Sequence, residues 1–241
     1  MAVEHFIRRM RKLAELTVAE TRFLEELVKE PSSFDPGQDI VGKGQKTRYL
    51  HVFLEGWACR YVDMADGERQ ILACLLPGDI SNRYLGPAGR FNYSVAALSH
   101  CRVAAVPAGS LAGIGAAQPN IARALWLSSL MEEAIAREWM ISLGRRAALQ
   151  SISHLLCEFR FRLSAVGLTV ANGFEFPVTQ REIADMVGMS VVHVNRILGE
   201  IRSQGLIEFG SGWMTILNLS GLMEACDFDA GYLDYESAET K

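Results

Sequence analysis

Long apolar runs are missing from the sequence, although 49% of its 241 residues are hydrophobic. A helix that crosses a bilayer needs roughly eighteen or more apolar residues in a row, and the charged N-terminus has no apolar segment of the secretory kind. We therefore expect a cytoplasmic protein with no membrane partner. The chain exceeds the usual size of one domain, so two domains fit its length better.

Cysteine is also scarce, and its positions argue against disulfide bridges. The five cysteines are odd in number and far apart, which favours reduced thiols over a disulfide framework. They lie at positions 59, 74, 101, 157 and 226.

Metal-binding residues are few in the part of the chain that is rich in predicted strands. Between residues 38 and 107 the histidines and glutamates are His51, Glu55, Glu68 and His100, and their spacing matches no common metal site. The same spacing gives no support to a haem held by Cys74 or by a histidine. A cupin-like metal enzyme is therefore a hypothesis that this region does not favour.

Positive charge is in short supply: 24 Lys and Arg stand against 28 Asp and Glu, a formal net charge of -4. Residues 145–205, however, carry seven basic against five acidic side chains, whereas residues 208–241 carry one lysine against seven acids. The local field matters more for nucleic acid than the total. A salt-sensitive DNA contact is thus compatible with this chain, through Arg145, Arg146, Arg181 and Arg202.

The most informative pattern lies at residues 179–198, which predict two short helices joined by a tight turn. Thr179 and Glu182 form a capping box that begins the first helix, Gly188 ends it in the left-handed conformation, and Ser190 can cap the second helix. Small or apolar residues give the helices a common core, at positions 183, 184, 187, 189, 194 and 197. This spacing predicts a helix-turn-helix, with an ordinary helical hairpin as the alternative.

The residues around this motif complete a domain. A helix at 146–164 precedes it, after a candidate hinge at Gly144-Arg-Arg, and strand-like runs at 206–209 and 214–217 flank a Gly-Ser-Gly turn. That hairpin predicts a wing, so we expect a winged helix-turn-helix that binds double-stranded DNA. The second helix of the motif, at 190–203, would enter the major groove.

Short apolar runs separated by glycine-bearing turns fill residues 38–107. They predict antiparallel strands at 39–41, 49–54, 58–62, 70–76, 94–98 and 101–106, which together form a compact barrel or roll. Two short helices that break near Thr17 are expected at residues 3–30. The basic run from Arg8 to Lys12 is interpreted as a solvated helix face.

A long helix is predicted at 119–144. Apolar residues occur nearly all round it, which indicates burial on more than one side, by the roll and by a partner's helix. Burial within a monomer is the alternative. Two-fold symmetry favours the homodimer, because one helix-turn-helix reads one half-site.

In this order, the helix pair, roll, long helix and winged helix-turn-helix resemble the Crp/Fnr superfamily of bacterial transcription regulators. The resemblance covers essentially the whole chain and is strongest at Glu55-Gly-Trp-Ala-Cys-Arg-Tyr, Leu76-Pro-Gly-Asp, Arg137-Glu-Trp and Ser190-Val-Val-His-Val-Asn-Arg. It implies an α+β fold with three parts. These are a sensor at 1–117, built as an antiparallel β-roll (double-stranded β-helix), a dimerisation helix at 118–144 and the winged domain at 145–241.

The resemblance also implies a homodimer at a palindromic DNA site, where RNA polymerase is recruited or obstructed. The oxygen-sensing branch of the family holds an iron-sulfur cluster with closely spaced N-terminal cysteines. No cysteine precedes Cys59, so we expect no iron-sulfur cluster here.

The sensor departs from the nucleotide-binding members of that family. Their pocket uses a Gly-Glu pair after the Pro-Gly-Asp turn and an Arg-Ser pair at a later strand, because a cyclic phosphate needs a guanidinium and backbone donors. Here residues 80–94 contain no Gly-Glu pair, Phe91 takes the arginine position, and Arg90 is one place away. A shift of one residue turns a strand side chain to the other face, and the base-contacting positions match Ala136 and Arg137. We expect no cyclic AMP, and the effector stays unknown.

The second helix of the motif, at 190–203, which we call the recognition helix, also departs from the family pattern. The nucleotide-dependent members of the family present Arg, Glu and a second Arg to the bases, where this chain has Val191, Val192 and Arg196. Arg196 can bind guanine O6 and N7, worth about 1–3 kcal/mol of discrimination, whereas the valines can only contact thymine methyl groups or leave room for the bases. Arg181 is expected at a phosphate. The full predicted DNA-binding set is Arg181, Ser190, Val191, Val192, His193, Asn195 and Arg196.

A sequence-specific transcription regulator is therefore the leading hypothesis, and not an enzyme. A protein-interaction module whose winged helix binds protein is the alternative from another class. Salt-dependent binding to duplex DNA distinguishes the two.

Overall fold

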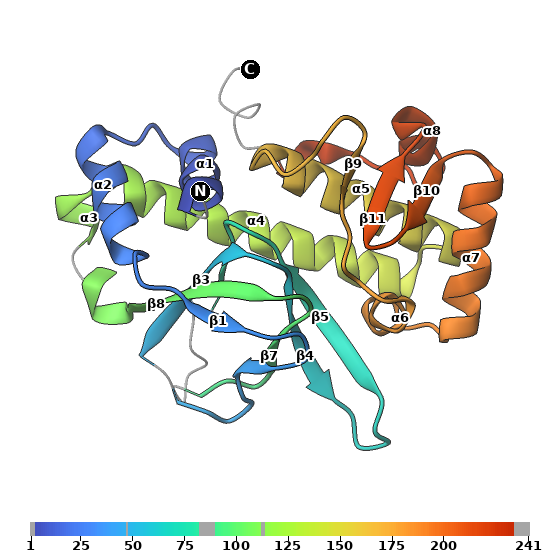
Figure 1. Ribbon diagram of the computed structural model, residues 1–241, viewed down its shortest axis with the longest axis horizontal. Helices are drawn as coiled ribbons and strands as arrows, with labels where there is room; N and C mark the ends of the chain where they lie inside the picture. Colours follow the sequence, from blue (N-terminus) through green and yellow to red (C-terminus); the bar gives the residue numbers. More distant parts are fainter. Residues whose placement is uncertain (1–2, 47, 82–89, 112–113, 234–241) are drawn as a thin grey trace. The chain divides into compact units, whose positions relative to one another are not determined.

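The computed structural model describes residues 3–46, 48–81, 90–111 and 114–233. The chain divides into two compact units, Met1–Leu130 and Met131–Lys241. Both combine helices with antiparallel sheet (Figure 1), which confirms the predicted α+β class. The boundary between the units falls inside a helix, so the division at 1–117, 118–144 and 145–241 stays a prediction.

Two helices begin the first unit, α1 at Val3–Leu13 and α2 at Val18–Leu27. Thr17 lies between them in an extended conformation, as the predicted break requires, and its hydroxyl accepts a hydrogen bond from the Glu20 amide at 3.1 Å. The Glu20 carboxylate in turn accepts from the Thr17 amide and, at 3.0 Å, from the backbone and side-chain nitrogens of Asn120. Burial raises the pKa of Glu20, but these hydrogen bonds outweigh it and lower the pKa to about 2.

The roll consists of two four-stranded antiparallel sheets. The first has the order β1-β8-β3-β6, and the second has the order β2-β7-β4-β5. The strands of the first are Ser32–Phe34, Cys101–Pro107, Tyr49–Glu55 and Ile80–Ser81, and those of the second are Asp39–Val41, Ser94–Ala97, Ala58–Asp63 and Arg69–Leu75.

Six of these strands match the predicted runs, and two, β1 and β6, were missed. β1 reads in sequence as the end of the helix pair, yet Ser32 pairs with Val103 and Phe34 with Cys101 on β8. β6 is only two residues long and is defined by its pairing with β3. Neither strand has a periodic sequence pattern of its own, because each is defined only by its pairing with a neighbouring strand.

One arginine of the basic run on α1 is not solvated. Arg9 forms an ion pair with Asp79 at 3.0 Å, and both side chains are almost fully buried. Asp79 also accepts from the Leu76 amide at 2.7 Å. Between them Gly78, with φ of 95°, lies so close to α1 that a Cβ would be 3.1 Å from the His5 carbonyl oxygen. The Pro-Gly-Asp turn thus attaches α1 to the roll, which corrects the prediction of a fully solvated face.

The long helix α4 covers Pro119–Gly144, as predicted. Before it, the chain forms a 3-10 turn at Ala108–Leu111 and a short helix, α3, at Ile114–Ala117. Large apolar side chains on α4 remain exposed at Trp126, Met140, Ile141 and Leu143. No helix within the described ranges is long and apolar enough to span a membrane.

The second unit is a winged helix. α5 (Ala148–Ala165) is followed by β9 (Gly173–Glu175), α6 (Gln180–Val187), α7 (Val191–Ser203), β10 (Ile207–Gly210) and β11 (Trp213–Ile216). The strands form one antiparallel sheet in the order β10-β11-β9, beside α6 and α7 in Figure 1. The predicted wing is confirmed. The acidic end of the chain adds α8 (Leu219–Glu224) and a 3-10 turn, η2 (Ala230–Leu233).

The ion pair between Arg9 and Asp79 gives the first testable prediction. In Arg9→Met the Asp79 charge stays buried without its cation, so we expect a loss of about 3–5 kcal/mol in the free energy of unfolding, measured by urea denaturation. Arg8→Met is the matched control, because Arg8 pairs with Glu4 on the exposed face of the same helix. Equal stability of the two variants would contradict this prediction.

Candidate nucleic-acid interface

The first helix of the motif is fixed at both ends by its own sequence. The Thr179 hydroxyl accepts from the Glu182 amide at 3.2 Å, and the Thr179 hydroxyl and amide both donate to the Glu182 carboxylate. Gly188 ends α6 with φ of 65°, in the left-handed region, and its amide donates to the Ala184 carbonyl. This confirms the predicted capping box and the glycine stop.

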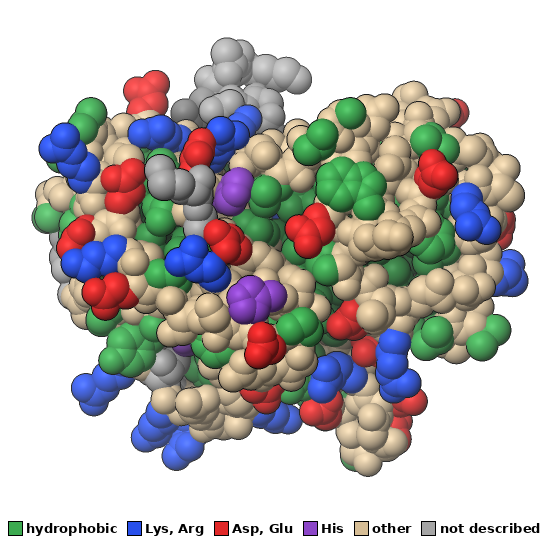
Figure 2. Space-filling view, viewed as in Figure 1, with side chains coloured by type: hydrophobic (Ala, Val, Ile, Leu, Met, Phe, Trp, Pro, Cys, Tyr) green, Lys and Arg blue, Asp and Glu red, His purple; other side chains and the backbone are tan. Residues whose placement is uncertain are grey.

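The second helix, α7, begins one residue after its cap, because the Ser190 hydroxyl accepts from the His193 amide at 3.3 Å. One face of α7 is buried through Val194, Ile197, Leu198 and Ile201. The opposite face is open: Val192 is 81% exposed and Val191 38%, and Asn195 and Arg196 are exposed too. Figure 2 shows hydrophobic side chains at the surface near the start of α7 and basic side chains farther along it.

Hydrogen bonds join the polar groups on this open face. The Asn195 amide donates to the Gln180 side-chain oxygen at 2.9 Å, and the Arg196 guanidinium donates to the His193 ring at 3.0 Å. Arg196 also lies 3.5 Å from the Glu200 carboxylate. Sequence reasoning missed Gln180, which lies fifteen residues before its partner and has no distinguishing pattern.

The cations expected at phosphates lie in different surroundings. Arg145 and Arg181 are exposed, and the Arg202 guanidinium lies 5.9 Å from the centre of the Phe209 ring. Arg146 is instead held inside the unit by Glu138 and Ser142, with its side chain only 15% exposed. The charge of Arg146 is therefore already paired within the unit, which gives no support to the expectation that it contacts phosphate.

The wing ends in a tight turn between β10 and β11. Ser211 and Gly212 both have positive φ, of 51° and 74°, as a two-residue hairpin requires. Trp213, the next residue, is 40% exposed and covers Gly173, where a Cβ would be 2.4 Å from the indole nitrogen. The wing therefore presents an indole ring that sequence reasoning did not single out.

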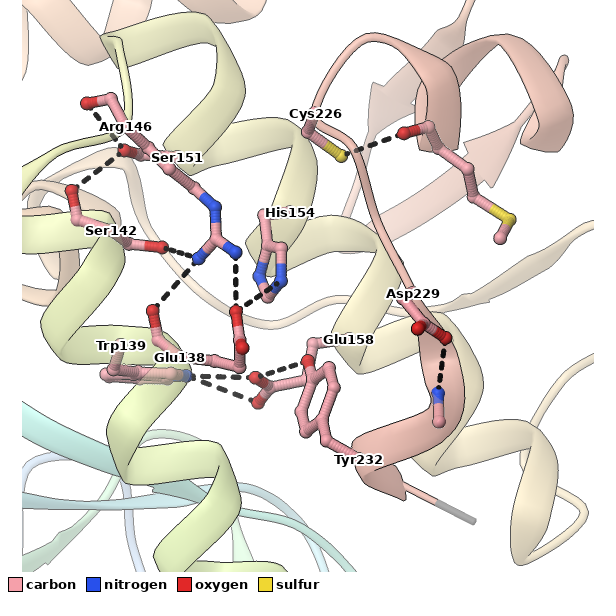
Figure 3. A network of polar contacts seen from close by, with 12 residues as sticks. Glu138, Trp139, Ser142, Arg146, Ser151, His154, Glu158, Cys226, Asp229 and Tyr232 are labelled. Carbon is pink, nitrogen blue, oxygen red and sulfur yellow. Dashed lines mark hydrogen bonds and ion pairs between the residues drawn. The ribbon is translucent and has the colours of Figure 1, made fainter. Parts of the chain in front are cut away.

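Behind the motif, α5 carries a buried polar network (Figure 3). The His154 ring nitrogen lies 3.3 Å from the Glu138 carboxylate, which also binds Arg146. Burial and, to a smaller extent, the Arg146 charge lower the pKa of His154 from its usual 6.5 to about 4, although the Glu138 charge opposes both. The rings of Phe228 and Tyr232 cover the imidazole. His154 is therefore neutral at pH 7 and can donate to Glu138.

At position 91 the roll lacks the arginine that a cyclic-nucleotide pocket of the family uses. Phe91 is 4% exposed and belongs to the apolar core, with Phe53, Val95 and Val103. Arg90 is exposed, and its guanidinium donates to the Gly44 carbonyl at 3.0 Å. The comparison with a Gly-Glu pair falls mainly on residues 82–89, which lie outside the described residues.

Neither cysteines nor carboxylates gather into a metal site in the part of the chain that the structure describes. All five cysteines are buried and form no disulfide. In the roll, the Cys101 thiol donates to the Trp57 carbonyl at 3.0 Å, and burial raises its pKa to about 11. This thiol is therefore protonated and structural.

Two glycines of the motif predict opposite effects of the same substitution. Gly188→Ala puts a side chain at positive φ and should cost about 1–2 kcal/mol. Gly199→Ala lies within α7, where an added Cβ meets nothing within 4 Å, and should gain about 0.5–1 kcal/mol. Thermal unfolding of both variants measures this, and a shift in the same direction would refute it.

His154 predicts a pH-dependent stability. Below pH 6.5 the unfolded chain takes up a proton that the folded state accepts only near pH 4. The free energy of unfolding therefore decreases as the pH is lowered from 6.5 to 4. The loss approaches about 1.4 kcal/mol for each pH unit. The difference in free energy of unfolding between wild type and His154→Gln should be largest at pH 8 and should shrink toward pH 4.5. Parallel stability curves for the two proteins would rule this out.

Comparisons with known proteins agree with this geometry. A model of the Crp-like helix-turn-helix domain matches residues 150–225, and a model of the cyclic nucleotide-binding domain matches residues 31–117. The solved structure of FixK2 from Bradyrhizobium japonicum has a TM-score of 0.72 and 27% sequence identity, and the match covers 81% of this chain and 96% of that one.

Two curated relatives are similar over most of their length. The transcriptional activator protein FnrL of Cereibacter sphaeroides is 28% identical over 85% of this chain and 84% of the relative. The nitrogen fixation regulation protein FixK of Bradyrhizobium diazoefficiens is 28% identical over 88% of both. These relatives are regulators rather than enzymes, which removes the cupin-like hypothesis. Both domain types are matched, and the second has the fold of a winged helix. The chain therefore belongs to the Crp/Fnr family of DNA-binding transcription regulators.

Proposed function

We propose that this transcription regulator acts as a cytoplasmic homodimer and reads a two-fold symmetric duplex site with the first half of α7. The observation that carries the proposal is the division of that helix. One face is buried in the winged domain through Val194, Ile197, Leu198 and Ile201, while the open face is shared by Val191, Val192, Asn195 and Arg196. A recognition helix needs this arrangement, because its exposed first turns meet the base edges.

Arg196 is the residue proposed to give most of the sequence preference. Its planar fork can bind guanine O6 and N7 together. Its present partners, His193 and Glu200, lie on the same accessible face, where ion pairs contribute little. Exchange of these partners for a base therefore costs little, and His193 is then available to a phosphate.

The other residues of the open face would read shape and methyl groups. Val191 and Val192 have no polar atom in the side chain, so they can contact thymine methyl groups. Asn195 is held by Gln180, which orients its amide before DNA arrives. Ser190 and Arg181 lie at the starts of α7 and α6, where helix N-termini and a cation favour phosphate.

The homodimer is supported by the surface of α4. Trp126 and Met140 are 60% and 63% exposed, and Ile141 and Leu143 are also open. Large apolar side chains on a helix surface mark an interaction site, and a second copy of α4 would bury them as an isologous contact. Two recognition helices then match two half-sites.

Further parts of the proposal follow from the relatives, several of which are named transcriptional activators. We infer that the bound dimer acts on RNA polymerase and that the roll responds to a signal other than cyclic AMP. Phe91 in the apolar core supports the second point, since it offers no charge to a cyclic phosphate.

Selection from a random duplex library tests the proposal. Wild type should enrich a two-fold symmetric motif, and Arg196→Ala should lose preference at one base pair of each half-site, worth about 1–3 kcal/mol. Arg181→Ala is the matched control, because loss of a phosphate contact lowers affinity for all sequences alike and reduces the salt slope by about one. Unchanged preference in Arg196→Ala would overturn the assignment, and no salt-dependent binding at all would favour the protein-interaction module.

A further inference from the structure

The junction between α4 and α5 is the place where the sequence suggested a hinge, and it is tied on both sides. Arg146 donates to Ser142 at 2.9 Å and to the Glu138 carbonyl at 3.0 Å. The Ser151 hydroxyl donates to the Ser142 carbonyl at 3.1 Å. The end of α4 and the start of α5 are therefore joined by side chains as well as by the three intervening residues.

Glu158 makes the deepest of these connections. Its side chain is fully buried, and its carboxylate accepts from the Trp139 indole of α4 at 3.1 and 3.3 Å, from Arg162 at 3.0 Å and from the Tyr232 hydroxyl at 3.2 Å. Burial raises the pKa of Glu158, and the Arg162 charge and these hydrogen bonds oppose that shift. A buried carboxylate requires all such partners, so α4, α5 and the C-terminal turn η2 converge on one group (Figure 3).

The C-terminal segment, residues 225–233, covers both buried carboxylate clusters. The buried Cys226 thiol donates to the Leu222 carbonyl at 3.2 Å. Phe228 packs on His154 and Phe161, with ring centres 4.9 and 5.3 Å apart. Tyr232 lies parallel to the His154 ring and reaches Glu158 with its hydroxyl. We call this segment the strap.

A recess lies between α4, α5 and α6, lined by Trp139, Ser142, Ser151, His154, Leu155, Met186 and Val187. Where side chains do not fill the space, dispersion contacts resist rotation only weakly. The directed hydrogen bonds to Glu138 and Glu158 therefore set the direction of this part of α4.

We propose that the strap fixes the bend between α4 and α5, with Tyr232 and Glu158 as positioning residues that set how the two recognition helices of a dimer are spaced. The inference rests on the proposed dimeric reading of DNA. A rigid bend lets only one half-site separation match both helices. A loosened bend accepts several separations while each helix still reads its own half-site.

Tyr232→Phe tests the proposal, because it removes only the hydroxyl and keeps the ring on His154. Binding is measured to the duplex selected by wild type, to duplexes with one or two base pairs inserted between the half-sites, and to a single half-site. Wild type should lose at least about tenfold in affinity on insertion. Tyr232→Phe should lose less than about threefold, with single half-site affinity unchanged.

Two controls separate the strap from the dimer proposal and from simple destabilisation. Tyr49→Phe, at a half-exposed tyrosine on β3, should retain the wild-type spacing profile. Hydrogen exchange without DNA should show residues 145–152 exchanging at least about tenfold faster in Tyr232→Phe, with α7 unchanged. Phe228→Leu, which weakens the strap at another point, should give the same two results if Tyr232→Phe fails to fold.

Unchanged exchange at the junction would overturn the strap whatever the DNA results are. Equal loss of affinity for all duplexes, single half-site included, would overturn it as well, since that outcome indicates a structural role only. A wild type that tolerates every insertion would instead overturn the dimeric reading, and the exchange experiment would still decide whether the strap holds the junction.

Discussion

The second unit depends on one constraint, which is that a fully buried carboxylate must find its hydrogen-bond donors within the protein. Glu158 has no exposed side-chain surface, so its oxygens must be satisfied from within the protein. Its donors come from three elements, Trp139 on α4, Arg162 on α5 and Tyr232 in η2, and Tyr232 lies 74 positions away in the sequence. Because removal of a partner leaves a buried charge in an apolar interior, these elements are held in one arrangement, and α5 also packs against α7 of the helix-turn-helix.

The surface proposed to read DNA is the open face of α7. The apolar side of α7 is used by the domain core, and the side left open carries one guanidinium, one amide and two valines. The two polar groups are pre-oriented by His193 and Gln180 through contacts on accessible surface. Such contacts orient the side chains, but they are weak enough for a base to replace them. Preference for sequence can then come from few residues, while the phosphate contribution stays small and salt-dependent.

The roll shares the family's architecture with a different interior. Phe91 lies in the apolar core where a cyclic phosphate would need a cation, and the neighbouring Arg90 faces the surface toward Gly44. Both residues lie in the loop before β7, which begins at Ser94. The same roll is fastened to α1 by the ion pair between Arg9 and Asp79, so the Pro-Gly-Asp turn has a structural use independent of any ligand.

By itself, the sequence determined the helix ends, the glycine turns, six roll strands, the long helix and the winged helix-turn-helix. Capping boxes such as Thr179 with Glu182 and periodic apolar residues act over a few positions, so they can be read without a fold. Tertiary structure alone decided that β1 and β6 are strands, that Arg9 and Arg146 are held inside their units, and that Asn195 meets Gln180. It alone also brought Tyr232 to Glu158, 74 positions away. These contacts join residues whose local sequence is unremarkable, and only the folded chain brings them within hydrogen-bonding distance.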